Sequence, residues 1–403
     1  MHRDAPPLRI LMVLESNFTK RGGGGAESQL RTIALALKRA GQRVAIMTPL
    51  SANGPQTTAE RCWGLAVARV KYPRWKVVGA GIMNLKFAAF LIANRDRYDA
   101  WHVHIGHNMG ALTCLIGAIV GKPVIVKISG WWELEAGLLA PNRGVFGRIA
   151  RGWLKRATVV QAISTRVAHE LEKHGFPRER VVVLPNAVDT ERFASRAAAR
   201  EVGKPFVAVY VGRLVPEKDL ATLIAGWAQA FGPHTDGRSD GGNGARSDGG
   251  NGARSDVRLR LVGGGPLEAE LSAQAERLGV AAQVEFLGHR DDVEAVLAEA
   301  HVGVLPSRIE GLSNTLLEFM ACGLPAIASR VSGSEDFVKP GRNGWLHDVG
   351  DVNAVAAALR EAEALAPAAL AELGQHARAD VESQAAVPRV IGRLMDFYRG
   401  QRV

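Results

Sequence analysis

The chain has 403 residues, two to three times the size of a typical domain, and we expect two domains of roughly 150 to 200 residues each. Hydrophobic residues make up 47% and charged residues 22%, which excludes collagen, coiled coils and an extensively disordered chain. The net charge of +10 is uneven, because residues 1–200 carry 30 basic and 13 acidic side chains and residues 201–403 carry 20 and 27. This basic half favours a phosphorylated substrate or an anionic membrane surface. Its Arg residues do not interleave with Trp and Tyr as a nucleic-acid stacking platform requires, so no nucleic-acid partner is expected.

The cysteines and apolar runs indicate a cytoplasmic protein. Cys62, Cys114 and Cys322 are too few and too widely spaced for a disulfide framework or a structural zinc site. The apolar run before Glu15 is too short for a signal-peptide core. The longest apolar stretch, residues 109–120, is far shorter than the roughly 20 residues that span a bilayer. We therefore expect a cytoplasmic protein that could bind peripherally at the membrane face.

Short apolar runs rich in β-branched residues alternate with amphipathic segments along the first half. A helix is expected over Glu27–Ala40, with Gly41 as its C-terminal stop. The runs are continuously apolar, which predicts burial on both faces and hence a parallel sheet with helices on each side. The expected strands are Leu8–Leu14, Val44–Met47, Val67–Val70, Trp101–His104, Val124–Ile128, Val159–Ala162 and Val181–Leu184.

The same alternation restarts after Pro185–Asp189, a segment with turn chemistry where the charge balance changes sign. We place the domain boundary there, giving a first domain over residues 1–186 and a second over 187–387, with a C-terminal helix over 388–403 returning to the first domain. Within 233–256 the octet RSDGGNGA occurs twice, which indicates a low-complexity surface insertion. The strands expected in the second domain are Phe206–Val211, Leu259–Val262, Val284–Leu287, Val302–Leu305 and Ala326–Ser329.

A glycine run precedes the first expected helix. Gly24 and Gly25 would let the backbone approach a phosphate at the positive end of that helix, although a glycine run is also merely a flexible turn. The second strand ends in Met47–Leu50, without the acidic residue that would hold the ribose of NAD. Residues 117–123 are one residue short of a P-loop and place Pro where Ser or Thr must bind magnesium.

Two cations follow the first strand of the second domain. Arg213 and Lys218 could together clamp a diphosphate at the carboxyl end of a parallel strand, or they could be solvated charges in an exposed turn. The Gly263–Gly265 loop after the next strand is expected near a nucleotide, with Gly264 at its centre.

Two carboxylates stand eight residues apart in the segment 306–325. Glu310 lies in a loop after a strand, and Glu318 falls in the first turn of the following helix. The amides of residues 311–315 could meet phosphate or sugar oxygens at that helix start. The alternative is a capping box formed by Thr315 and Glu318, in which the carboxylate only satisfies backbone donors.

The order of these motifs resembles that of retaining GT-B glycosyltransferases of family 4. The resemblance covers nearly the whole chain outside the octet insertion, and it implies an α/β fold of two Rossmann-like, doubly wound parallel-sheet domains that face an interdomain cleft. It is carried by Gly-Gly-Ala-Glu before the first helix, WHVHIGH at 101–107, GRL with Lys218, LVGGGP at 261–266, FLGHRDDV at 286–293, and PSRIEGLSNTLLEFMACGLPAIAS with Gly333, Glu335 and Gly344.

The resemblance also implies roles for individual residues. Arg213 and Lys218 would hold the donor diphosphate and stabilise the departing nucleotide, and Glu310 would act at the reactive face of the transferred sugar. Glu318 would bind the ribose hydroxyls, while Gly24 and Gly25 would approach the donor phosphates. Further positions implied to bind substrate are Gly264, Arg290, Gly311, Leu312, Ser313, Asn314 and Thr315.

The chemistry agrees with these roles, because glycosyl transfer develops positive charge at carbon and negative charge on the leaving diphosphate. No D-x-D triplet occurs, so the two cations can replace a metal ion, and we predict neither metal nor cofactor. Family members often carry a His after the fifth strand, where this chain has Ser129, which we retain as a substrate-binding candidate. His104 and His107 are further candidates, although a loop His is often structural.

We therefore expect an enzyme that moves a hexosyl group, with retention, from a UDP- or GDP-sugar to a glycan or lipid-linked acceptor. The expected setting is the synthesis of cell-surface polysaccharide, lipopolysaccharide or glycolipid. The alternatives are a sugar-nucleotide epimerase or phosphorylase on the same architecture, and a non-catalytic glycosyltransferase-like binding subunit. A nicotinamide oxidoreductase ranks last.

Overall fold

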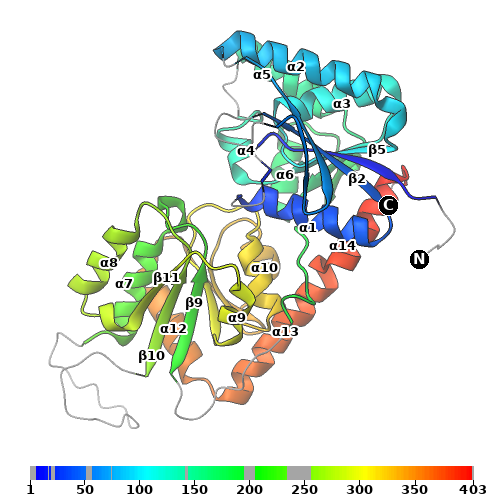
Figure 1. The fold of residues 1–403 in the computed structure, drawn as a ribbon. Coiled ribbons are helices and arrows are strands. Elements are labelled where there is room, and N and C mark those ends of the chain that lie inside the picture. The colour runs from blue at the N-terminus through cyan, green and yellow to red at the C-terminus, as the bar shows by residue number, and fades with distance from the viewer. Residues whose placement is uncertain are drawn as a thin grey trace. The chain divides into compact units, whose positions relative to one another are not determined.

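The fold of the chain is described by a computed structural model (Figure 1). Contacts divide the chain into two units: unit 1 holds residues 1–189, 311–314 and 383–403, and unit 2 holds 190–310 and 315–382. The expected insertion 233–256, with both copies of the octet, lies outside the described residues except for its first and last positions. The described residues are 6–16, 18–19, 23–50, 57–73, 75–140, 144–194, 205–233 and 256–401.

Unit 1 is built on an eight-stranded sheet with the order β3-β4-β2-β1-β5-β6-β7-β8. Its neighbouring strands pair in parallel except β3 and β4, which form an antiparallel hairpin that the sequence analysis did not predict. Trp63 and Gly64 both have positive φ in the two-residue turn between them, as a type I′ hairpin turn requires. The strands are β1 Arg9–Val13, β2 Arg43–Pro49, β3 Ala59–Cys62, β4 Leu65–Val70, β5 Ala100–Val103, β6 Val124–Ile128, β7 Val159–Ala162 and β8 Val181–Val183.

Helices cover this sheet in two groups. Helix α3 contacts both α2 and α5, whereas α1 packs against α14, which returns from the C-terminal part of the chain. The apolar face of α14 is buried in one core with α1 and the central strands. The helices are α1 Gly25–Arg39, α2 Lys76–Ala93, α3 Asn108–Val120, α4 Trp131–Glu135, α5 Gly144–Leu154, α6 Thr165–Lys173 and α14 Val387–Tyr398, with 3₁₀ turns at Arg95–Arg97 and Arg178–Arg180.

Unit 2 contains a six-stranded, wholly parallel sheet with the order β11-β10-β9-β12-β13-β14. Its strands are β9 Phe206–Val211, β10 Val257–Val262, β11 Val284–Gly288, β12 Val302–Leu305, β13 Ala326–Ser329 and β14 Gly344–His347. Its helices are α7 Leu220–Phe231, α8 Glu268–Arg277, α9 Val293–Ala298, α10 Asn314–Ala321, α11 Ser334–Phe337, α12 Val352–Ala364 and α13 Pro367–Ala385, with 3₁₀ turns at Pro216–Lys218 and Ala281–Gln283.

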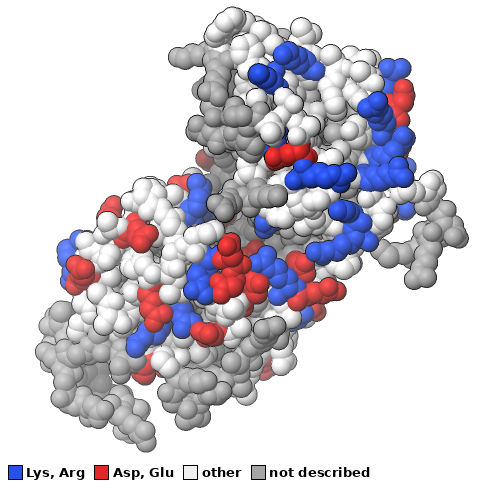
Figure 2. Space-filling model, viewed as in Figure 1, with Lys and Arg blue, Asp and Glu red and all other residues white. Residues whose placement is uncertain are grey.

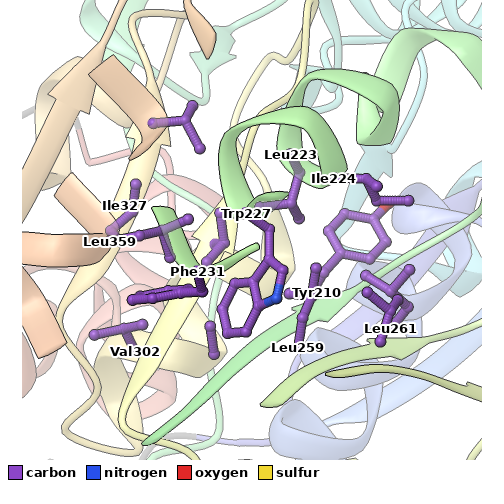
Figure 3. Packing of buried hydrophobic residues seen from close by; sticks show 14 of the residues in the cluster. Tyr210, Leu223, Ile224, Trp227, Phe231, Leu259, Leu261, Val302, Ile327 and Leu359 are labelled. Carbon is purple, nitrogen blue, oxygen red and sulfur yellow. The ribbon is translucent and has the colours of Figure 1, made fainter. Parts of the chain in front are cut away.

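The core of unit 2 lies between this sheet and helices α7 and α12. Figure 3 shows Trp227 and Phe231 of α7 packed among Tyr210, Leu259 and Val302 from the strands. The rings of Trp227 and Phe231 meet edge to face, with centroids 4.7 Å apart. The indole N–H of Trp227 donates to Gln283 Oε1 at 2.8 Å, so this buried polar atom is satisfied.

The prediction of two doubly wound units with parallel sheets is confirmed. Two strands among the described residues were not predicted, the edge hairpin strand β3 and the strand β14 of unit 2. Within the described ranges, no helix is both long enough and apolar enough to cross a membrane.

Candidate active site

The strand order of unit 2 reverses between β9 and β12, which are neighbours in the sheet. Chain connections leave in opposite directions at such a point, so the loops after the two strands leave room for a ligand at their carboxyl ends. The loop after β9 carries Arg213 and Lys218, and the loop after β12 carries Glu310. The topology therefore places three predicted catalytic residues at the position where open α/β sheets bind ligands.

Lys218 and Glu310 contact each other directly at this edge. The ammonium of Lys218 donates to Glu310 Oε1, and Ser307 Oγ donates to the same oxygen at 3.0 Å. Only 18% of the Lys218 side chain and 13% of the Glu310 side chain are exposed. A charge pair so shielded from water interacts more strongly than one on an open surface.

Arg213 has a different partner. Its guanidinium lies 3.3 Å from Glu217, and 71% of its side chain is exposed. The backbone beneath it is fixed, because the buried Tyr210 hydroxyl donates to Arg213 O at 2.9 Å. Within unit 2 the two predicted phosphate ligands thus occupy one loop but hold separate carboxylates.

The sequence analysis missed a second ion pair beside this one. Asp219 has a left-handed backbone (φ 51°, ψ 40°), and its side chain is buried. Its Oδ1 accepts from the Arg308 guanidinium at 2.9 Å, while its Oδ2 has no hydrogen-bond partner among the described residues. In addition, Arg308 N donates to Glu217 O at 2.9 Å. These bonds fasten the loop after β12 to the loop after β9, and no local sequence pattern could have revealed them.

The predicted glycine loop is packed against the same segment. Gly263 has φ +124°, and a Cβ there would overlap Gly212 O. A Cβ on Gly265 would likewise overlap Leu214 O, whereas one on Gly264 would meet nothing within 4 Å. Gly264 is exposed between two tightly packed neighbours, and Leu214 N donates to its carbonyl at 3.0 Å. The outer two glycines are required by close backbone approach.

The remaining predicted residues of unit 2 lie on two other elements. Arg290 forms a bidentate, exposed pair with Asp292 at 2.8 and 2.7 Å. Glu318 is partly buried on α10. Because α10 begins at Asn314, Thr315 lies inside the helix and not at the N-cap position that the capping-box alternative requires.

The corresponding switch point of unit 1 lies between β1 and β5. Glu15, just after β1, accepts from His107 Nδ1 at 2.8 Å and from Met109 N at 2.6 Å. These bonds hold the loop after β5 and the start of α3, and they leave the His107 ring partly exposed. The sequence analysis did not single out Glu15.

At the start of α1, the Glu27 carboxylate binds a backbone amide of the glycine run. Glu27 accepts from Gly24 N at 2.8 Å and also from Ser16 Oγ. Gly24 and Gly25 are exposed where α1 begins, as the phosphate interpretation requires, but one of their amides already has a partner in the chain.

Ser129 lies after β6, where hydrogen bonds to Glu133 hold it in position. The sequence analysis did not predict a role for Glu133. The buried carboxylate of Glu133 accepts from Ser129 N at 2.5 Å, Ser129 Oγ at 2.8 Å, Gly130 N at 2.9 Å and Gly106 N at 2.5 Å. Burial raises the pKa of Glu133, and these hydrogen bonds oppose that shift. Glu133 thereby joins the loops after β5 and β6.

His104 lies in the interior of unit 1, stacked on His102 with ring centroids 4.2 Å apart. Lys127 of β6 is also fully buried, and its ammonium has no hydrogen-bond partner among the described residues. Burial lowers the pKa of Lys127 to about 7, and burial is also the main cause that lowers the pKa of both histidines. The Tyr398 hydroxyl of α14 contacts His102 Nδ1 at 2.7 Å.

The short segment 311–314 is grouped with unit 1. There the side-chain amide of Asn186 donates to Leu312 O at 3.0 Å and to Asn314 Oδ1 at 2.8 Å. Asn314 Nδ2 donates to Gly25 O at 3.2 Å, which brings two predicted binding residues together. Gly311, Leu312 and Ser313 are buried. In the part of the chain that the structure describes, no group of three or more His, Cys, Asp and Glu is placed to hold a metal ion.

Comparisons with known proteins address both units. The family model described as glycosyltransferase family 4 matches residues 23–192, and the model described as glycosyl transferases group 1 matches residues 205–363. Anabaena HepE, solved in complex with UDP, superposes with a TM-score of 0.72 at 20% identity, covering 96% of this chain and 99% of that one. This likeness shows the fold.

Curated relatives agree with the family models. The lipopolysaccharide core biosynthesis glycosyltransferase LpsE of Rhizobium meliloti is 28% identical over 241 residues, 57% of this chain and 63% of the relative. A GDP-mannose-dependent phosphatidylinositol monomannoside mannosyltransferase of Mycobacterium tuberculosis is 30% identical over 298 residues, 70% of this chain and 71% of the relative. The chain spans only 48% to 65% of the length of four curated relatives that it matches, LpsE among them. Both family models and the mycobacterial relative show that the chain belongs to glycosyltransferase family 4, the glycosyl transferases group 1, and has the GT-B fold.

Proposed function

We propose that the chain transfers a glycosyl group, with retention, from a nucleoside diphosphate sugar to an acceptor used in cell-surface polysaccharide or glycolipid synthesis. The observation that carries the proposal is the Lys218–Glu310 ion pair at the switch point of unit 2. It joins a cation suited to a leaving diphosphate and a carboxylate suited to a sugar at one sheet edge. Family membership supplies the reaction class.

In this proposal Lys218 and Arg213 stabilise the charge that develops on the leaving diphosphate. Preorganised charges of this kind contribute about 100-fold or more to rate when they meet charge formed in the transition state. When the phosphates bind Lys218, the Glu310 carboxylate exchanges its bond with the Lys218 ammonium for bonds with the sugar hydroxyls. The hydrogen bond from Ser307 holds that carboxylate during the exchange. The ion pair in the structure thus holds both side chains ready before the donor arrives.

The other proposed contacts divide between the units. Unit 2 binds the nucleotide through Glu318, Thr315 and Gly264, with Arg290 at the edge of the donor site. Unit 1 admits the acceptor, and we assign this role to His107 and Ser129 in preference to the buried His104. Glycines 24 and 25 and residues 311–314 supply backbone groups to the donor.

The donor class is proposed from similar proteins. HepE was also solved in complex with UDP-glucose, and the mycobacterial relative is named as GDP-mannose-dependent. Both donors are nucleoside diphosphate hexoses. We propose a hexosyl donor of the same class, with the base to be decided by assay.

The test uses the purified full chain with UDP-, GDP- and ADP-sugars and a mixture of glycan and lipid-linked acceptors. We expect one donor to release nucleotide only when acceptor is present, and NMR of the product to show a retained anomeric configuration. The same turnover in EDTA tests the predicted independence of metal.

Variants then tie the activity to the site. Lys218→Ala and Glu310→Gln should each lower turnover by about 100-fold or more. The matched control is Arg277→Ala, which removes an exposed cation from α8 of the same unit and should change turnover by less than about twofold. Epimerised sugar nucleotide or sugar phosphate as the product would instead support an epimerase or phosphorylase. No turnover and no binding with any donor would contradict the proposal.

A further inference from the structure

Two consecutive tryptophans on the short helix α4 have different surroundings. The indole N–H of Trp131 donates to Glu135 Oε1 at 2.6 Å, and the Arg166 guanidinium lies over the Trp131 ring, 5.0 Å from its centroid. Among the described residues Trp132 has neither a hydrogen bond to its indole nor a cation over its ring, and 55% of Trp132 is accessible. Single exposed apolar residues are common on protein surfaces, so the neighbours of Trp132 decide whether it belongs to a site.

The ring beside Trp132 is that of His107, from the loop after β5. The two ring centroids lie 6.1 Å apart, and the ring planes are inclined by 31°. His107 Nδ1 lies 2.8 Å from Glu15 Oε1, and 32% of the His107 side chain is exposed. Small-molecule sites typically combine an aromatic surface with a few polar groups held in fixed positions. Trp132 and His107 together have this composition.

One buried carboxylate holds the segments that carry the two rings. Glu133 accepts from Gly130 N, at the N-cap of α4, at 2.9 Å. It also accepts from Gly106 N, in the residue that precedes His107. Helix α4 and the loop after β5 are therefore fixed relative to each other before any ligand arrives. Such preorganisation reduces the entropy that a ligand must overcome on binding.

Helix α4 and the loop after β5 lie at the carboxyl edge of the unit 1 sheet. The loop follows the strand next to β1 at the switch point, and α4 follows β6, the next strand in the sheet. Open α/β sheets bind ligands at this edge. Gly311, which groups with unit 1 and follows Glu310 in the chain, packs there as well. A Cβ on Gly311 would come within 3.0 Å of Gly130 Cα and 3.3 Å of Ser129 O.

The charges of unit 1 narrow the class of ligand. Residues 1–200 carry 30 basic and 13 acidic side chains, and the charged side chains over unit 1 in Figure 2 are mostly blue. Three carboxylates lie around the two rings, and each accepts a hydrogen bond from the chain: Glu15, Glu133 and Glu135. A net positive unit disfavours a polycationic ligand and is compatible with a neutral or acidic one.

We propose that the Trp132 ring stacks against a pyranose ring of the acceptor, with His107 binding hydroxyl groups at the rim of that sugar. One face of a hexopyranose presents C–H groups, whose partial positive charge suits the negative face of an indole. The hydroxyl groups lie around the edge, where they can donate to or accept from an imidazole. The acceptor is then a neutral or acidic saccharide. This inference rests on the proposed function, because it names the acceptor class of that reaction.

A binding measurement that needs no turnover tests the stacking directly. The full chain has eight tryptophans, and labelling with 5-fluorotryptophan gives each one a fluorine NMR signal. The signal that is absent from Trp132→Phe belongs to Trp132. Methyl hexopyranosides should shift this signal when titrated to about 0.1 M, a range that covers the millimolar affinity of a single sugar ring. Sorbitol, an acyclic polyol, should leave it unmoved at the same concentration.

Kinetics with an acceptor that supports turnover provide the second readout. Trp132→Ala should raise the KM for acceptor by about tenfold or more, because truncating a tryptophan at the centre of a contact commonly has that effect. The KM for donor and kcat should change by less than about threefold, since stacking stabilises the ground state and the transition state alike. Trp132→Phe keeps an aromatic face and should restore most of the affinity.

The matched control is Trp75→Ala, which removes another exposed tryptophan of unit 1 and should leave both KM values unchanged. The fluorine signal of Trp75 should likewise not respond to the pyranosides. Unchanged melting temperatures show that the variants are folded.

The outcomes separate this inference from the proposed function. A Trp132 signal that no pyranoside shifts, or that sorbitol shifts equally, overturns the stacking and leaves glycosyl transfer untouched. An unchanged acceptor KM in Trp132→Ala does the same, and a rise confined to the donor KM overturns the assignment to the acceptor. A pyranoside-specific shift in a chain that turns over no donor supports the sugar site while the proposed function fails.

Discussion

Lys218 and Glu310 are 92 residues apart in the chain, yet the ammonium of one donates directly to the carboxylate of the other within unit 2. One side chain follows β9 and the other follows β12, so the neighbouring positions of these strands create the pair. Both side chains are mostly buried, and each would be left without its counter-charge if the other were neutralised. The pair therefore has a structural role as well as the proposed chemical one.

The two roles separate in a double-mutant cycle. Glu310→Gln should lower the free energy of unfolding by roughly 1 to 3 kcal/mol, because it removes the counter-charge of a mostly buried ammonium. Lys218→Met combined with Glu310→Gln should recover part of that loss but none of the turnover. Urea titration and the transfer assay measure the two quantities. Strictly additive losses of stability would show that the pair is not coupled.

The glycine loop offers an adjacent pair of positions with opposite expectations. Gly263→Ala should destabilise unit 2 by at least about 2 kcal/mol, because the backbone has φ +124° and the new Cβ would overlap Gly212 O. Gly264→Ala should leave the melting temperature nearly unchanged, since its Cβ would meet nothing within 4 Å. If Gly264 borders the donor, the second variant should still weaken donor binding in calorimetry. Equal stability of the two variants would refute the packing argument.

The buried Lys127 should make stability depend on pH. Its pKa is about 7 in the folded chain, against about 10.4 when unfolded, so the unfolded chain holds the extra proton between these values. The free energy of unfolding should therefore rise with pH across that window, and the cost of Lys127 is fully present below pH 7. Lys127→Met should stabilise the chain at pH 7 by roughly 1 to 3 kcal/mol.

Urea titrations from pH 7 to 10 test this prediction, with the difference between Lys127→Met and the parent chain shrinking as pH rises. The groups that interact with the ammonium are His102, His104 and Glu133. The pKa of His102 is lowered to about 3 and that of His104 well below its usual range, so neither histidine changes its charge between pH 7 and 10. Lys173→Met on the exposed side of α6 is the control and should show no such trend. A difference that stays constant with pH would mean that Lys127 is charged in the folded chain.

Glu133 should be required to keep the loops after β5 and β6 well ordered. Glu133→Ala leaves four donors from Gly106, Ser129 and Gly130 without their acceptor, and we expect a loss of at least about 2 kcal/mol. Amide hydrogen exchange should accelerate at those three residues while β5 and β6 stay protected. The exposed neighbour Glu135, replaced by Ala, serves as the comparison. Protection unchanged at Gly106 would show that the carboxylate does not hold the loop.

The three thiols should be unreactive in the folded chain. Cys62, Cys114 and Cys322 are buried, and burial raises the pKa of Cys322 to about 12 and that of Cys114 further. Because the thiolate is the reacting form, Cys322 should react with a disulfide reagent at pH 8 about a thousandfold more slowly than a free thiol. Three equivalents should react at once in guanidinium chloride. Rapid native reaction would reveal local opening around these sites.

Local periodicity predicted most of the fold. The continuously apolar runs around β1, β6 and β9 indicated buried parallel strands, and the structure has strands there. The strand β3 escaped prediction because Ala59–Cys62 is a polar edge segment, whose pairing depends on the hairpin turn rather than on apolar periodicity. β14 is short and only partly buried, so its signal is equally weak.

The candidate site was predictable only where its motifs are local. Glu310 and Lys218 could be named from their surroundings in the sequence, but their contact depends on the strand order of unit 2. Asp219 gave no local signal, since its partner Arg308 lies on another loop. Glu133 has local partners in Ser129 and Gly130, but its bond to Gly106 joins it to a different loop and has no local signal. Lys127 stands in a run that reads as an ordinary strand, and its burial is set by helix α14 and the residues that cover the sheet.

The position of helix α14 in the chain affects how the protein folds during its synthesis on the ribosome. The Tyr398 hydroxyl of α14 contacts the buried His102. Val390, Ile391 and Leu394 of the same helix pack in a core whose strands were synthesised hundreds of residues earlier. Until α14 is synthesised, part of the apolar surface of the unit 1 sheet stays uncovered. Unit 2, in contrast, has its own strands and helices by then. Folding of unit 1 therefore depends on a helix that is synthesised after unit 2, and a chain arrested before α14 would present that surface to chaperones.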